Sequence, residues 1–150
     1  MTSKTSVEAF VAQKTLALAG ASRSGKKFGN SILKELRQKE YTVYPVHPEA
    51  ETIDGVRCYR SFADLPEEVG GVLLVVKPEQ TAQLVRDAKD AGIPRVWMQQ
   101  GARSEEAVQF CRDNGIDVVQ KECILMFTEP VNGVHSFHRW LWKVFGKLPR

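Results

Sequence analysis

Short apolar runs alternate with longer amphipathic segments along most of the chain. The apolar runs predict strands at residues 15–19, 41–46, 71–76, 95–99 and 116–119. Helices are predicted between them, one from about Asn30, one from Pro78 to about Gly92 and one from Ser104 to about Asn114. Because continuous apolar strands that alternate with helices are typical of a parallel sheet covered on both faces, we predict an α/β fold. It is a Rossmann-like, doubly wound parallel sheet of about five strands in three α/β/α layers.

Length and composition favour one globular domain. The chain has 150 residues, of which 43% are hydrophobic and 26% charged. No apolar run approaches the roughly 20 residues that cross a bilayer, and the first residues do not resemble a secretory signal. The three cysteines, Cys58, Cys111 and Cys123, have no CxxC spacing, which argues against a disulfide framework or a zinc site. We therefore expect a cytoplasmic protein without a metal site.

The C-terminal segment differs from the rest of the chain. Residues 1–130 are expected to form the domain, and residues 131–150 a basic amphipathic helix that packs on the domain or on a partner. Such a helix can also lie on an anionic membrane, but globular packing is the commoner use of an apolar stripe. The net charge of +3 is too small to indicate nucleic-acid binding. We expect a monomer or a homodimer.

Candidate ligand residues lie where the predicted strands end, because doubly wound sheets bind ligands beyond the carboxyl ends of their strands. The first strand runs into a glycine turn with three cations, and glycine turns that lead into a helix present backbone N–H groups to phosphate. These turns contribute Gly20, Ala21, Ser22, Arg23, Ser24, Lys26, Lys27 and Gly29, then His47 and Pro48, then Lys77 and Pro78, and finally Gln100 and Gly101.

Two familiar nucleotide motifs fit the first turn poorly. The string from Gly20 to Lys26 matches most of a P-loop, but Lys27 stands where Ser or Thr holds magnesium, which argues against a kinase or ATPase. The NAD fingerprint needs a middle glycine, and Ser22 stands there. It also needs an acid at the end of the second strand, where Glu49 comes only after Pro48. The residues favour a phosphorylated nucleoside, which leaves both coenzyme A and NADP open.

Four stretches carry a resemblance to a known family: residues 20–23, 41–48, 96–101 and 118–123. The chain resembles the small CoA-binding domain proteins, single-domain relatives of the N-terminal domain of the succinyl-CoA synthetase α subunit. The resemblance covers roughly residues 15–127 and implies a Rossmann-like fold that binds coenzyme A. It implies that Ser22, Arg23 and Lys26 face the phosphates, that the His47-Pro48 turn lies by the adenosine, and that Val76, Lys77 and Pro78 wall the site. This chain has His47 where the family usually has Asn.

The function expected from the sequence is the binding of coenzyme A or an acyl-CoA, in a regulatory or carrier role. No general acid–base pair is visible, so the sequence favours a binding module over an enzyme. The alternatives are an NADP- or acyl-CoA-dependent enzyme and an adaptor that binds a membrane or partner through the C-terminal helix. Cys123 follows the fifth strand at the ligand edge, beside Lys121. It is either core packing or a redox-active thiol that forms a mixed disulfide with coenzyme A.

Overall fold

The computed structural model describes residues 4–128, and its centre is a five-stranded sheet. The strand order is β2-β1-β5-β6-β7, and all neighbouring strands are parallel. This order changes direction between β1 and β5, the point at which doubly wound sheets hold their ligands. The strands are β1 (Thr15–Ala19), β2 (Thr42–Val46), β5 (Gly71–Leu74), β6 (Arg95–Gln99) and β7 (Asp117–Glu122).

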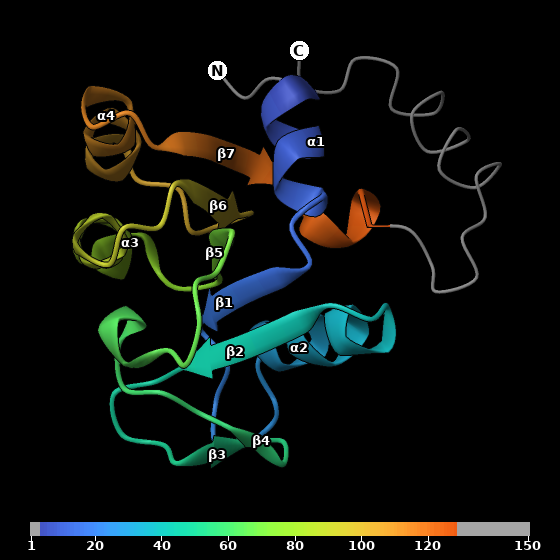
Figure 1. Ribbon diagram of the computed structural model, residues 1–150. Coiled ribbons are helices and arrows are strands. Elements are labelled where there is room, and N and C mark those ends of the chain that lie inside the picture. Colours follow the sequence, from blue (N-terminus) through green and yellow to red (C-terminus); the bar gives the residue numbers. More distant parts are fainter. Residues whose placement is uncertain (1–3, 129–150) are drawn as a thin grey trace, which may run out of the picture.

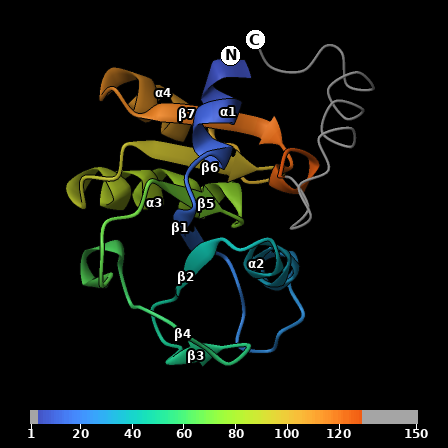
Figure 2. The same cartoon turned by 45° about the vertical axis from the view of Figure 1, so that its right-hand side comes forward.

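Helices cover both faces of the sheet, as Figures 1 and 2 show. Helices α1 (Lys4–Val11) and α2 (Phe28–Gln38) pack on one face, together with the short 3-10 helix η2 (Ile124–Met126). Helices α3 (Pro78–Asp90) and α4 (Glu105–Asp113) pack on the other. Alternate residues of each strand enter the two cores, so that Leu16 and Leu18 face α2 whereas Ala17 and Ala19 face the opposite side. The three-layer α/β/α prediction is confirmed.

Several elements differ from the prediction. Helix α1 was not predicted, because its polar sequence has only two fully buried apolar anchors, Val7 and Phe10. Helix α2 begins at Phe28, before the predicted start near Asn30. Strand β5 ends at Leu74 instead of residue 76, although the Val75 amide still donates to the Ala19 carbonyl at 2.9 Å. Strand β7 extends to Glu122.

A small hairpin, also not predicted, lies beside the end of β2. Its strands are β3 (Thr52–Ile53) and β4 (Val56–Arg57), joined by Asp54 and Gly55, both with positive φ. This is the conformation of a type I′ turn, which favours an Asp-Gly pair. The following 3-10 helix η1 spans Phe62–Asp64. In Figures 1 and 2 the connection from β1 to α2 reaches down to this hairpin.

Within residues 4–128, no helix is long and apolar enough to cross a membrane. The predicted basic amphipathic helix at residues 131–150 lies outside the described residues, and so does the predicted domain boundary at residue 130.

Candidate ligand-binding site

A cleft of about 1120 Å³ opens at the carboxyl ends of β1, β2 and β5. The first turns of α2 and α3 and the loop after β6 complete its walls. It therefore lies at the point where the strand order changes direction, between β1 and β5. A space of this volume accommodates a cofactor-sized ligand.

The turn between β1 and α2 is packed tightly enough to require glycine at two positions. Gly20 has a φ of +122°, and a Cβ there would lie 2.1 Å from the Val75 carbonyl oxygen. A Cβ on Gly29 would lie 2.6 Å from the Gly20 carbonyl oxygen. The two glycines thus let the start of α2 approach the ends of β1 and β5, which places the helix N-terminus on the cleft.

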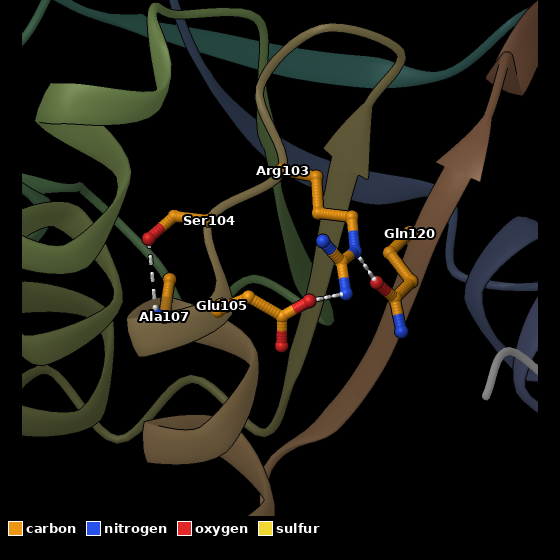
Figure 3. Close-up of polar contacts among 5 residues, drawn as sticks. All are labelled: Arg103, Ser104, Glu105, Ala107 and Gln120. Carbon is orange, nitrogen blue, oxygen red and sulfur yellow. Dashed lines mark hydrogen bonds and ion pairs between the residues drawn. The ribbon is translucent and has the colours of Figure 1, made fainter.

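Two helix N-termini meet at this cleft, and neither has a side-chain cap. Lys27 occupies the N-cap position of α2 and Lys77 that of α3, and both line the cleft. Their ammonium groups add to the positive ends of two helix dipoles. Helix α4 differs, because Ser104 accepts a hydrogen bond from the Ala107 amide at 3.3 Å (Figure 3). The backbone N–H groups of Phe28 and Gly29 in α2 and of Glu79 in α3 precede the first intrahelical acceptor and form a site suited to an anionic ligand.

Polar contacts hold the loop after β6, which contributes Gln100 and Gly101 to the cleft wall. Arg103 donates to Gln120 of β7 and pairs with Glu105 of α4 (Figure 3). Buried Thr81 in the first turn of α3 donates to the Ala102 carbonyl at 2.6 Å. The loop is thereby fixed to β7, α4 and α3, which makes this wall of the cleft a preformed surface.

The cationic part of the first turn lies elsewhere. Ser22, Arg23, Ser24 and Lys26 are absent from the residues that line the cleft. Instead, Asn30 is 3% exposed, and its side chain holds this segment against the hairpin. Its Oδ1 accepts from the Ser22 amide at 2.8 Å, and its Nδ2 donates to the Ser22 carbonyl at 2.9 Å and to Asp54 Oδ2 at 2.8 Å.

The end of β2 and the segment after the hairpin contribute His47 and Arg60 to the cleft wall. His47 Nδ1 accepts from the amides of Glu49 and Ala50 at 3.0 and 3.1 Å, which closes the turn through Pro48. Arg60 reaches the same cleft from the segment after the hairpin. The wall thus has three cationic residues, Lys27, Arg60 and Lys77, and three acidic residues, Glu49, Glu79 and Asp87.

The structure brings most of the predicted ligand residues together on the cleft. These are Gly20, Ala21, Lys27, Gly29, His47, Pro48, Val76, Lys77, Pro78, Gln100 and Gly101. Other wall residues were not predicted: Ala19, Phe28, Val46, Glu49, Arg60, Ser61, Phe62, Val75, Glu79, Gln80, Gln83, Leu84 and Asp87. The position of Phe28 follows from the predicted glycine turn, but that of Arg60 depends on a distant strand pairing.

The three cysteines are free and occupy different environments. Cys111 is fully buried, and burial raises the pKa of its thiol to about 12. Burial also raises the pKa of the Cys58 thiol. Cys123 is half-buried and does not line the cleft. No cluster of three potential metal ligands occurs among the described residues.

Comparison with known proteins finds relatives of two kinds, a much longer CoA ligase and solved structures of similar size to this chain. ADP-forming acetate–CoA ligase I of Archaeoglobus fulgidus is 29% identical over 136 residues, which are 84% of this chain and 20% of the ligase. This chain thus spans about a fifth of that enzyme.

Two solved structures of similar size share the fold. A conserved hypothetical protein from Pyrococcus furiosus is 39% identical, with a TM-score of 0.73, over 77% of this chain and 99% of that structure. A hypothetical protein from Pyrococcus horikoshii OT3 is 30% identical, with a TM-score of 0.78, over 94% of this chain and 92% of that structure. The family model described as CoA binding domain matches residues 14–129, and the chain belongs to that family.

Proposed function

We propose that this protein binds coenzyme A, or an acyl-CoA thioester, in the cleft between β1 and β5. It does so in a regulatory or carrier role, as a monomer or homodimer, without catalysing a reaction itself. Membership of the CoA binding domain family supports the identity of the ligand. The three free cysteines suit a reducing compartment, and we place the protein in the cytoplasm.

The observation that carries this proposal is the pair of uncapped helix N-termini on one cleft. A diphosphate is a compact anion that accepts several hydrogen bonds at once. The N–H groups of Phe28 and Gly29 in α2 and of Glu79 in α3 supply donors for it without a side-chain cap in competition. Lys27 and Lys77 add one positive charge at each N-terminus. We therefore assign the diphosphate of coenzyme A to the starts of α2 and α3.

The remaining walls suit the other parts of the ligand. Apolar side chains from β2, β5 and α3 include Val46, Val76 and Leu84, which offer surface to an adenine ring or an alkyl chain. Phe28 adds an aromatic face that is 52% exposed. The pantetheine arm is assigned to the side of the cleft formed by Gln100 and Gly101. The mixed disulfide between Cys123 and coenzyme A stays a prediction.

The ligase relatives do not extend this proposal to their reaction. The region shared with the Archaeoglobus enzyme is 20% of its length. The cleft wall contains cations, amides and the carboxylates of Glu49, Glu79 and Asp87, all of which belong to exposed or half-buried residues. A general acid or base is normally held beside its partner in a defined geometry, and none of these carboxylates has a hydrogen-bonded nucleophile among the described residues. The proposal is accordingly a binding function.

The test is titration calorimetry with coenzyme A, dephospho-CoA, NAD and NADP on the parent protein and on Lys27→Gln/Lys77→Gln. Because each charge-assisted hydrogen bond is worth roughly 1.5–3 kcal/mol, the double variant should bind coenzyme A at least about tenfold more weakly. The matched control is Lys34→Gln/Lys89→Gln, which removes one exposed lysine from each of the same helices away from the cleft. Tighter binding of NAD than of coenzyme A, or equal losses in the two variants, would overturn the proposal.

A further inference from the structure

A segment far along the chain extends the end of β2. Tyr59 forms a parallel bridge with Val46, donates to the Pro45 carbonyl at 2.9 Å and accepts from the His47 amide at 2.8 Å. Since the two segments run parallel, the residues that follow the bridge, His47 and Arg60, are neighbours in the register. Both line the cleft. The pairing thus brings an imidazole and a guanidinium to one corner of the site.

Hydrogen bonds to the backbone define the state of the imidazole. His47 Nδ1 is an acceptor for two amides, Glu49 at 3.0 Å and Ala50 at 3.1 Å. A ring nitrogen that accepts carries no proton, so the proton of the neutral ring is on Nε2. The ring therefore closes its own turn with one nitrogen and offers an N–H donor with the other.

Arg60 supplies the charge at this corner. Its side chain is exposed, and within residues 4–128 its guanidinium has no ion-pair or hydrogen-bond partner. A guanidinium presents paired N–H donors that match the oxygens of a phosphate. Glu49, two residues after His47, is an acidic residue of the same cleft wall. A carboxylate on the same wall lowers the positive potential there, and the Arg60 guanidinium offsets it.

We propose that His47 and Arg60 form a second anion subsite, distinct from the starts of α2 and α3, which binds the phosphate on the adenosine ribose of coenzyme A. This inference rests on the proposed function and names the specificity of the same site. The ribose phosphate is the group that coenzyme A carries and dephospho-CoA lacks. His47 and Arg60 therefore select coenzyme A over dephospho-CoA, whereas Lys27 and Lys77 bind the diphosphate that both ligands share.

The experiment measures the ratio of the dissociation constants of dephospho-CoA and coenzyme A by calorimetry. We expect a ratio of at least about ten for the parent protein, because the loss of one charge-assisted hydrogen bond weakens binding by about this factor or more. Arg60→Gln should bring the ratio close to one by weakening the binding of coenzyme A more than that of dephospho-CoA. His47→Asn keeps an acceptor for the turn but withdraws the ring N–H, and it should lower the ratio partly. Glu49→Gln should raise the ratio.

Arg57→Gln is the matched control, because Arg57 is an exposed arginine three residues away that does not line the cleft. If Arg57→Gln lowers the ratio as much as Arg60→Gln does, the effect comes from the loss of any positive charge near the cleft, and the inference is overturned. A parent ratio near one, with both ligands bound, would overturn it while the proposed function stands. If neither ligand binds, the proposed function fails. Adenosine 2′,5′-bisphosphate that binds more tightly than the 3′,5′ isomer would place an NADP-like ribose in the corner and overturn the assignment to coenzyme A.

Discussion

The replacement of Asn30 by Asp tests how the first turn is held in place. The two side chains have nearly the same shape, but the variant replaces the Nδ2 donor by an oxygen. It keeps the contact with the Ser22 amide and loses the bonds to the Ser22 carbonyl, at 2.9 Å, and to Asp54 Oδ2, at 2.8 Å. The Asp54 contact becomes a contact between two carboxylates.

The size of the effect follows from three contributions. The two lost hydrogen bonds are worth about 1 kcal/mol each in net terms. Two like charges about 4 Å apart repel by roughly 1–4 kcal/mol, and the exposed position of Asp54 favours the lower end of this range. A carboxylate in the first turn of α2 recovers up to about 1 kcal/mol through the helix dipole. We expect Asn30→Asp to lower the free energy of unfolding by about 2–4 kcal/mol, which most domains of this size survive.

Urea denaturation at pH 7 measures the loss, and a double-mutant cycle isolates its cause. Asp54→Asn in the parent should cost below about 1 kcal/mol, since the new amide oxygen still accepts from Asn30. In the Asn30→Asp background the same change removes the repulsion and lets the new amide donate to the new carboxylate, so it should recover about 2 kcal/mol. Purely additive effects of the two substitutions would refute the proposed link between the turn and the hairpin.

Two other predictions concern the cleft and the core. Phe28→Ala should weaken the binding of coenzyme A by about 0.5–1.5 kcal/mol in calorimetry, because Phe28 lines the cleft. It should leave the midpoint of urea denaturation nearly unchanged, because Phe28 is 52% exposed. An unaltered affinity would show that the Phe28 ring does not stack on the ligand. Burial raises the pKa of the Cys111 thiol to about 12, whereas a thiol in the unfolded chain titrates near about 8.5. Between these two values the folded state binds more protons than the unfolded state. The free energy of unfolding should therefore fall as the pH rises from about 9. Tyr44 adds to this decline, since its hydrogen bond to Glu67 raises the pKa of the phenol to about 12. Cys111→Ala should show a shallower decline between about pH 8 and 10.5 in urea denaturation, and an equal slope would mean that Cys111 contributes nothing to it.

The sheet was predictable from the sequence because its signals are local. Each strand is a short apolar run bounded by glycine, proline or a polar cluster, and each run lies between amphipathic segments. Parallel strands that alternate with helices have few connection patterns, which also predicts the edge at which ligand residues gather. The lining of the cleft by Gly20, His47, Lys77 and Gly101 follows from this reasoning alone.

The elements that were missed depend on contacts between distant residues. Helix α1 exists because Phe10 packs on Trp97, with ring centroids 5.2 Å apart, and covers a part of the sheet that α2 leaves open. Strands β3 and β4 have two residues each, too few to show any periodicity. The Asp54-Gly55 pair was nevertheless a hairpin signal that the sequence offered.

The cationic residues that line the cleft could not all be predicted from residues close together in the sequence. Arg23 and Lys26 are close to Lys27 in sequence, yet the anchoring of Ser22 by Asn30 holds their segment against the hairpin and outside the cleft wall. Arg60 lies on the wall because Tyr59 pairs with Val46, a contact between residues separated by the whole hairpin. Charge clusters along a sequence therefore identify candidate loops but do not identify the side chains that line the cleft.

His47 shows that a departure from a family pattern can preserve geometry while it changes chemistry. The turn after β2 needs an acceptor for the amides of Glu49 and Ala50, and an Asn side chain at this position would offer its carbonyl oxygen. His47 offers Nδ1 in its place, so the turn through Pro48 keeps its hydrogen bonds. An imidazole reaches farther than a carboxamide and places its remaining N–H beyond the atoms that close the turn. The substitution is then neutral for the backbone, and we expect any effect of His47→Asn on ligand preference to arise from the shorter reach of the Asn N–H donors.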